Sequence, residues 1–302
     1  MLTIGSRGSL LALWQANWVK AQLEALGETC RIEIIRTTGD KITDVPLAKV
    51  GTKGLFTKEI EEALLDGRVD LAVHSLKDLP TVVPAGLVVT AIPQREDPRD
   101  ALVGHRLAGI PPNAVIGTSS LRRGAQLRAL RPDLEIRDLR GNLDTRLRKL
   151  DEGRYDTIVL ASAGLCRLGW ADRIAEAVAV DVLCPAAGQG ALAIETRADG
   201  RHAAELCARL DHPATRAAVT AEREALESLG GGCQVPIGAH ARIEGSRMFL
   251  RGVVISPESD IVVKHQLEGE AADAVLLGRR LGEMLLASGA GQILERVYGK
   301  SV

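Results

Sequence analysis

The chain has 302 residues, of which 46% are hydrophobic, so it is long enough for two or three domains with cores of their own. Its net charge of −1 and its 2% aromatic content argue against a general nucleic-acid binder, which needs a basic surface or base-stacking rings. Residues 10–14 form the longest apolar stretch near the start; it is too short to span a membrane and no signal peptide precedes it, so we expect a cytoplasmic protein.

The first two-thirds of the chain repeat one pattern, in which a short apolar strand leads through a loop of small or polar residues into a helix or turn. The pattern occurs at residues 2–27, 68–81, 113–130 and 155–169. Alternating strands and helices predict an α/β fold with mainly parallel sheets. In such sheets ligands bind beyond the carboxyl ends of the strands, which places the loops of this pattern at a candidate site.

Two linkers interrupt this pattern. Residues 91–100 carry two prolines and dense charge, and residues 182–195 form a second break. Linkers on both sides of a middle segment predict that one domain is inserted into another, with a double hinge between two lobes. We expect domain 1 to comprise residues 1–95 and 188–211, and domain 2 residues 96–187.

The remaining residues, 212–302, predict a smaller α+β domain with an antiparallel sheet. A long helix comes first, three strands follow, and a second helix is expected at residues 271–287. Glu222 falls within the apolar arc of the first helix, so we expect a buried carboxylate paired with a basic group.

Five cysteines are present, and no two of them form a C-x-x-C pair, which disfavours a zinc site or a disulfide framework. Cys233 stands apart because it directly follows Gly230, Gly231 and Gly232. Glycines after a helix are ordinary C-cap residues. They also leave a thiol easy to approach, so a structural and a chemical interpretation both remain open.

Basic and hydroxyl side chains collect in the loops that follow the predicted strands. Helix N-termini and arginine forks both bind anions, and the chain has neither a P-loop nor a dinucleotide-binding glycine motif. The grouping favours a ligand with several carboxylates, although each residue alone also fits a solvated surface charge. The residues concerned are Ser6, Arg7, Ser9, Lys49, Lys53, Lys58, Arg122, Arg123, Arg140, Arg146 and Arg167.

Asp78 is the main candidate for acid chemistry. It follows the strand at residues 70–73, close to Lys77 and His74. A turn aspartate before Leu79 and Pro80 is the alternative interpretation. The chain has no G-x-S-x-G motif for a serine nucleophile.

Seven segments and the cysteine-bearing stretch at residues 222–238 resemble, in order and over nearly the whole chain, the porphobilinogen deaminase family. The seven segments are "VGTKGLFTKEIE", "AVHSLKDLPT", "REDPRDALV", "GTSSLRRGAQL", "LRGNLDTRL", "LASAGLCRLG" and "AAGQGALAIE". The resemblance implies two periplasmic-binding-protein-like lobes and a small C-terminal domain. It also implies a transferase of tetrapyrrole biosynthesis that joins four porphobilinogen molecules head to tail and releases hydroxymethylbilane and ammonia.

The same resemblance implies roles for single residues. Cys233 would carry a dipyrromethane cofactor as a thioether, and Asp78 would be the catalytic acid. The implied cofactor-binding residues are Ser75, Lys77, Thr118, Ser120, Arg122, Arg123, Arg140 and Arg146. The implied substrate-binding residues are Arg7, Ser9, Lys53, Arg140, Arg146, Arg167 and Gln189. A monomer that binds no metal, nucleic acid or membrane is implied as well.

Two other classes of protein remain as alternatives. A two-lobed anion-binding protein without catalytic activity would explain the basic loops but would leave Cys233 without a function. A hydrolase could use Cys233 as nucleophile with His240 or His74 as its base.

Overall fold

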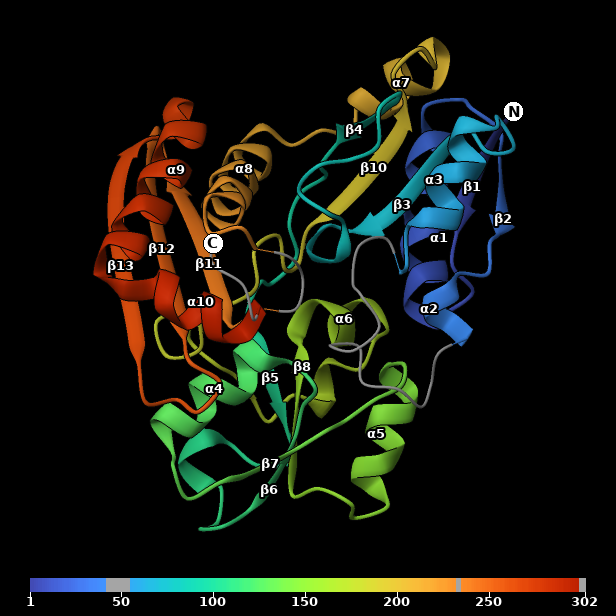
Figure 1. The fold of residues 1–302 in the computed structure, drawn as a ribbon. Helices are drawn as coiled ribbons and strands as arrows, with labels where there is room; N and C mark the ends of the chain where they lie inside the picture. Colours follow the sequence, from blue (N-terminus) through green and yellow to red (C-terminus); the bar gives the residue numbers. More distant parts are fainter. Residues whose placement is uncertain (42–54, 232–234, 299–302) are drawn as a thin grey trace. The chain divides into compact units, whose positions relative to one another are not determined.

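The computed structural model describes residues 1–41, 55–231 and 235–298, which fall into two compact units (Figure 1). Unit 1 comprises Met1–Glu96 and Gly190–Arg216, and unit 2 comprises Asp97–Gln189 and Ala217–Val302. The C-terminal sheet therefore belongs to the same compact unit as the inserted segment. The division into three domains with the boundaries given above remains a prediction.

Unit 1 is built on a five-stranded mixed sheet in the order β2-β1-β3-β10-β4. Strand β1 pairs in parallel with β2 and β3, whereas β10 is antiparallel to both β3 and β4. The strands are β1 (Leu2–Ser6), β2 (Cys30–Ile34), β3 (Leu71–Ser75), β4 (Leu87–Ala91) and β10 (Leu192–Arg197). The helices are α1 (Leu10–Ala25), α2 (Thr38–Lys41), α3 (Lys58–Leu65), η2 (Leu76–Asp78) and α7 (Arg201–Ala208).

Both faces of this sheet are covered, which explains the continuous apolar run of β3. Leu71 and Val73 pack in the cluster that includes residues of α1 and α7, and Ala72 packs in the cluster of α3. Alternate residues of a strand point to opposite faces, so a strand between two helical layers must be apolar throughout.

The sheet of unit 2 repeats the same pairing scheme in the order β7-β6-β8-β5-β9. Strand β6 is parallel to β7 and β8, and β5 is antiparallel to β8 and β9. The strands are β5 (Asp100–Val103), β6 (Val115–Gly117), β7 (Glu135–Arg137), β8 (Thr157–Ala161) and β9 (Glu176–Ala177). The helices are η3 (Leu107–Gly109), α4 (Leu121–Leu130), α5 (Leu143–Asp151), α6 (Ser162–Arg167) and η4 (Ala171–Arg173).

The predicted α/β class is confirmed, and the sheets are mixed rather than almost wholly parallel. Parallel neighbours require a crossover helix, as between β6 and β8. Strand β10 enters unit 1 after the chain has passed through the inserted segment, and it joins the sheet in the opposite direction.

The C-terminal part of unit 2 is a three-stranded antiparallel sheet with one face packed against helices. The strands are β11 (Ile237–Glu244), β12 (Arg247–Ile255) and β13 (Val262–Glu270). The helices are α8 (Pro213–Ser228), which begins in unit 1, η5 (Ala271–Asp273), α9 (Ala274–Leu285), η6 (Leu286–Ala290) and α10 (Gly291–Tyr298). Their apolar side chains form one core with the sheet.

Two glycines of α9 allow it to approach α8 closely. A Cβ atom added at Gly278 would lie 2.4 Å from the carbonyl oxygen of Ala221, and one added at Gly282 would lie 2.4 Å from the Cβ of Ser228. The two glycines are four residues apart and so share one face of the helix. Within the described ranges, no helix is both long and apolar enough to cross a membrane.

Candidate functional site

In unit 1 the candidate residues lie at one edge of the sheet. Strands β1 and β3 are parallel neighbours, with Ile4 opposite Leu71, and they end at Ser6 and Ser75. The segments that follow the two strands therefore leave the sheet at the same edge. These segments carry Arg7, Ser9, Lys77 and Asp78.

Asp78 ends the short helix η2, which buried side chains hold in place. Leu76 and Leu79 are 1% and 2% exposed, and the backbone N–H of Leu76 donates to the carbonyl oxygen of Ala191 at 3.0 Å. Ser75 accepts a hydrogen bond of 2.9 Å from the Nε2 atom of Gln15. Asp78 itself is exposed, so a rigid turn presents a carboxyl group to the outside.

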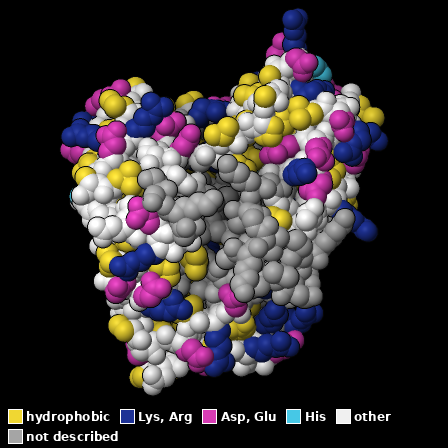
Figure 2. Space-filling model, viewed as in Figure 1, with side chains coloured by type: hydrophobic (Ala, Val, Ile, Leu, Met, Phe, Trp, Pro, Cys, Tyr) yellow, Lys and Arg dark blue, Asp and Glu magenta, His cyan; other side chains and the backbone are white. Residues whose placement is uncertain are grey.

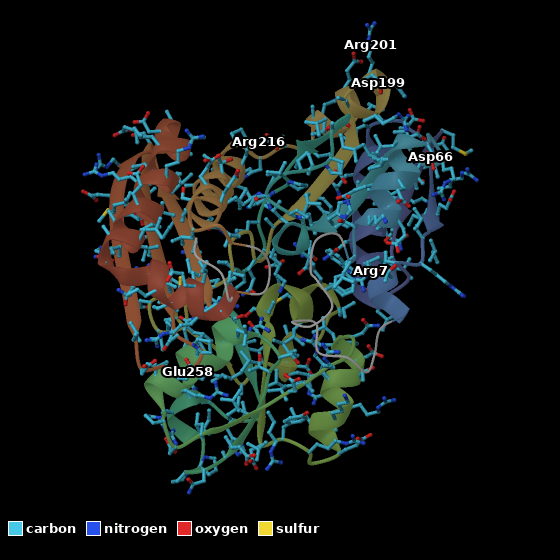
Figure 3. The ribbon with its side chains drawn as sticks, in the orientation of Figure 1. Arg7, Asp66, Asp199, Arg201, Arg216 and Glu258 are labelled. Atoms are coloured by element: carbon cyan, nitrogen blue, oxygen red, sulfur yellow. The ribbon has the colours of Figure 1, made fainter. Side chains whose placement is uncertain are left out.

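The start of α1 is suited to an anion. Ser9 is the N-cap and accepts a hydrogen bond of 3.3 Å from the N–H of Ala12, and the first turn has no acidic residue. The Arg7 guanidinium lies 4.3 Å from the ring centre of Phe56, and Figure 3 shows Arg7 close to this end of α1. The helix dipole and Arg7 both favour negative charge here.

His74 is held by a buried carboxylate. Its Nε2 lies 3.0 Å from the Oε2 of Glu195, and both side chains are buried. A nearby carboxyl group, Glu61, has its pKa raised by burial. This environment supports a structural role for His74 rather than that of a base for a cysteine nucleophile.

In unit 2 the candidate residues follow three parallel strands, β7, β6 and β8, which again end at one sheet edge. Ser120 caps α4, and its Oγ accepts from the N–H of Arg123 at 3.4 Å. The Oγ1 of Thr118 accepts from the N–H of Ser120 at 3.2 Å. Both predicted hydroxyl residues thus shape the turn that begins α4.

Arg140 and Arg146 frame the start of α5. The Nε of Arg146 donates to the carbonyl oxygen of Gly141 at 2.8 Å, and Lys149 donates to that of Arg140 at 3.0 Å. Gly141 has φ +113°, a conformation that other residues rarely adopt. Both arginines are half-buried, and Arg167 at the end of α6 is 8% exposed.

Arg122, Arg123 and Gln189 surround a residue that the sequence did not single out, Asp100. The Nη1 of Arg122 lies 2.6 Å from its Oδ2, the Nε of Arg123 lies 2.8 Å from its Oδ1, and the Nε2 of Gln189 lies 2.9 Å from the same Oδ1. All four side chains are buried. Burial alone would raise the pKa of Asp100, but the two guanidiniums outweigh it and hold this pKa well below its ordinary value. Two guanidiniums therefore share one buried carboxylate.

Glu222 is fully buried, as predicted, and its carboxylate binds backbone amides. Its Oε2 accepts from the N–H of Gly188 at 2.7 Å, and its Oε1 accepts from the N–H of Ala241 at 2.8 Å. The carboxylate therefore joins α8 to the end of the inserted segment and to β11.

The two glycines at the end of α8 show ordinary C-cap geometry. Gly230 has φ +65°, and the N–H of Gly231 donates to the carbonyl oxygen of Leu226 at 3.0 Å. This is the pattern of a Schellman cap. Cys233 and Lys53 lie outside the described residues.

The other four cysteines are free thiols. Burial raises the pKa of Cys184 and of Cys207 to about 12, and it also raises that of Cys30. A thiol with a raised pKa is a poor nucleophile at neutral pH.

Comparison with known proteins gives matches over nearly the whole chain. The family model described as "Porphobilinogen deaminase, dipyromethane cofactor binding domain" matches residues 2–205, and "Porphobilinogen deaminase, C-terminal domain" matches residues 216–287. The porphobilinogen deaminase of Syntrophobacter fumaroxidans is 52% identical and covers 99% of this chain and 98% of its own length. That of Syntrophotalea carbinolica is 54% identical, with 97% and 95% covered. Among solved structures, a periplasmic substrate-binding protein of an ABC transporter from Coxiella burnetii is 15% identical, with a TM-score of 0.43 over 72% of this chain and 94% of that one.

Proposed function

The chain belongs to the porphobilinogen deaminase family, and from that premise we propose how its own residues join four porphobilinogen molecules into hydroxymethylbilane with release of ammonia. The proposal rests on one observation above all. An exposed carboxyl group, Asp78, stands on an anchored turn at the same sheet edge as Arg7 and the N-terminus of α1. An acid and an anion site at one edge suit a substrate that carries both an amine and carboxylates.

Arg7 and Ser9 would bind a substrate carboxylate. Porphobilinogen carries an acetate and a propionate group, so two negative charges need partners. A guanidinium forms charge-assisted hydrogen bonds with a carboxylate, and the free N–H groups of α1 add to the attraction. Binding there would fix the ring relative to Asp78.

Asp78 would act on the aminomethyl group. It would hold a proton at the leaving nitrogen while the C–N bond breaks, and ammonia would depart with the bonding electron pair. The methylene-pyrrole left behind is a cation, and the Asp78 carboxylate would stabilise it as a counter-anion. One carboxyl group can thus serve both stages of the step.

The donor set in unit 2 fits the carboxylates of a dipyrromethane cofactor. The arginines at the start of α5 and the capped N-terminus of α4 both favour anions. When bound, this group supplies the pyrrole carbon to which a new ring is joined. Thr118, Ser120, Arg140 and Arg146 would hold its side chains. The family resemblance adds Lys77 and Ser75 to the residues that would bind the cofactor. Cys233 would be its attachment point.

The remaining assignments follow the family resemblance. Arg167 and Gln189 would support the substrate site, Arg122 and Arg123 the cofactor site, and Lys53 would contact substrate. We propose a monomeric, cytoplasmic enzyme, and light scattering after size-exclusion chromatography tests the monomer.

The decisive experiment measures ammonia and tetrapyrrole formed from porphobilinogen by wild type and by Asp78→Asn. The variant keeps the shape of the side chain but can neither donate the proton nor carry the negative charge, so we expect kcat to fall at least about a hundredfold with KM little changed. Asp199→Asn is the matched control, because Asp199 is an exposed aspartate elsewhere in unit 1. Near-normal turnover in Asp78→Asn would remove Asp78 from catalysis.

A further inference from the structure

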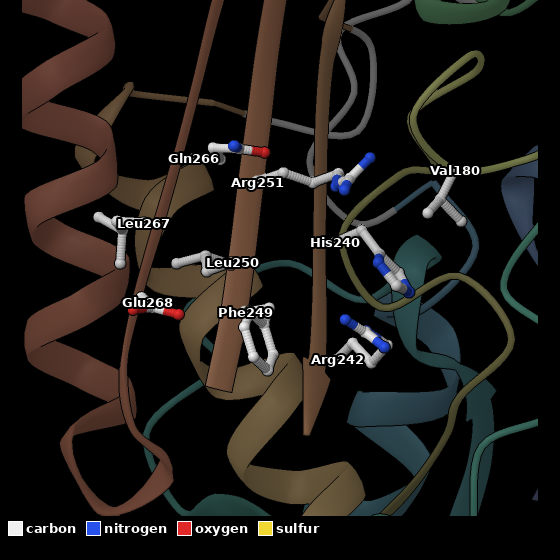
Figure 4. Close-up of a pocket in the computed structure, with 9 residues that line it drawn as sticks. All are labelled: Val180, His240, Arg242, Phe249, Leu250, Arg251, Gln266, Leu267 and Glu268. Atoms are coloured by element: carbon white, nitrogen blue, oxygen red, sulfur yellow. The ribbon is translucent and has the colours of Figure 1, made fainter. Parts of the chain in front are cut away.

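A pocket of about 280 Å³ lies on the three-stranded C-terminal sheet, within unit 2 (Figure 4). The opposite face of that sheet packs against α9 through Leu250 and Leu267. The pocket opens on the other face, where Figure 4 shows His240, Arg242 and Arg251 projecting toward the segment that carries Val180. Its lining residues include none of the residues assigned above to the substrate or the cofactor.

Strand register brings the polar lining residues together in two adjacent rows. His240, Arg251 and Gln266 are opposite one another across β11, β12 and β13, and Arg242, Phe249 and Glu268 form the next row. Residues two apart on a strand share a face, and opposite residues have Cβ atoms about 4.5–5.5 Å apart. Their functional groups can therefore contact one small ligand.

One of the guanidiniums that line the pocket has no carboxylate partner among the described residues. Glu268 pairs with Arg247 at 3.1 Å, and Arg242 donates to Glu244 and lies 4.9 Å from the ring centre of Phe249. Arg251 is half-buried and forms no ion pair with any carboxylate in the part of the chain that the structure describes. A partly buried cation is costly unless an anion accompanies it.

We propose that this Arg251 pocket binds a small flat ring that bears carboxylates. The Arg251 fork would bind a carboxylate through two hydrogen bonds, the Gln266 amide would donate another, and the ring would stack on Phe249. The volume is near the lower limit of about 300 Å³ for small-molecule pockets and suits a single ring. The carboxylated pyrroles of the proposed function belong to this chemical class, as do unrelated aromatic acids.

The test is isothermal titration of the holoenzyme with two probes, pyrrole-3,4-dicarboxylate and benzene-1,2-dicarboxylate. The pyrrole probe lacks an aminomethyl group and cannot be turned over. The variants are Arg251→Gln and Lys264→Gln, which remove the same charge from the same face of the sheet, and Lys264 does not line the pocket. Phe249→Leu supplies a second variant that keeps the charge and removes the stacking ring.

We expect Arg251→Gln to weaken binding of at least one probe about tenfold or more, since one charge-assisted contact is lost. Lys264→Gln should stay within about twofold of wild type, as a contact outside the pocket should. Preference for the pyrrole probe would identify the enzyme's own pyrroles as ligand, and equal affinity would identify aromatic carboxylates in general; both support the site. Absence of saturable binding, or unchanged affinity in Arg251→Gln and Phe249→Leu, would overturn it. Turnover of porphobilinogen is measured in a separate assay. The binding result can therefore be interpreted even if the proposed function fails.

Discussion

The Nη1 atom of Arg122 lies 2.6 Å from the Oδ2 of Asp100, with both side chains buried beside Arg123. Two cations and one anion share a site from which water is largely excluded. Removing the anion takes a buried partner away from both guanidiniums. Loss of Asp100 should therefore destabilise unit 2.

Asp100→Asn should lower the free energy of unfolding by about 3–5 kcal/mol, the usual cost of removing one partner from a buried ion pair. Urea unfolding followed by circular dichroism measures it. Asp133→Asn breaks a surface ion pair with Arg131 and should leave the urea midpoint of unfolding unchanged. Equal midpoints for the two variants would contradict this prediction.

The depressed pKa of Asp100 also makes the free energy of unfolding depend on pH. An unfolded aspartate takes up a proton near pH 3.9, whereas the folded carboxylate does so only at lower pH. Between these values the unfolded state binds the extra proton, so acid favours unfolding. The contribution of ionised Asp100 to stability is fully present above about pH 4 and is lost as the pH falls through the pKa of the folded state. Urea midpoints from pH 7 to pH 3 should fall more steeply for wild type than for Asp100→Asn.

Arg146→Leu should stall chain growth and leave partly elongated protein that intact mass spectrometry detects. The reason is that carboxylates of the growing chain lose a guanidinium partner. Arg148→Leu is the matched control on α5. Arg148 is exposed, and its Nε forms a surface ion pair of 3.7 Å with the Oε1 of Glu152. Identical kinetics and masses for the two variants would make Arg146 a surface charge.

Intact wild-type protein should weigh more than its sequence by two porphobilinogen units less two ammonias. Peptide mapping should place this mass on Cys233, because burial keeps the thiols of Cys30, Cys184 and Cys207 protonated. Cys233→Ser should show neither the added mass nor activity. A modification on another cysteine, or an unmodified mass for active enzyme, would refute the assignment.

Gly278→Ala should destabilise the protein by about 1–3 kcal/mol, since the added methyl group would overlap the backbone of α8. Gly109→Ala is the control, because a Cβ atom there meets nothing within 4 Å. Thermal unfolding of the two variants measures the difference. A stabilised Gly278→Ala would show that α9 can shift away from α8 at no cost.

The sequence predicted features whose causes are local. Strand and helix alternation predicted the α/β class, and the polar loops of that pattern contain Ser9 and Ser120, which cap helices in the structure. The partners of Arg122 and Arg123 could not be predicted, because Asp100 lies 22 and 23 residues away and only the tertiary fold brings them together. An aspartate that begins the apolar strand "DALV" was the available signal. The antiparallel direction of β5 and β10 likewise depends on how distant segments return to a sheet.

The carboxylate of Glu222 has a consequence for how the protein unfolds. It accepts hydrogen bonds from the N–H groups of Gly188 and Ala241 at once, and a separate hydrogen bond from Arg128 to the carbonyl oxygen of Pro257 joins the same two parts of unit 2. Separating the C-terminal sheet from the inserted segment would break one of these two hydrogen bonds to a buried carboxylate. The two parts should therefore lose structure in a single cooperative transition, and amide hydrogen exchange should assign β11 and α4 the same opening free energy.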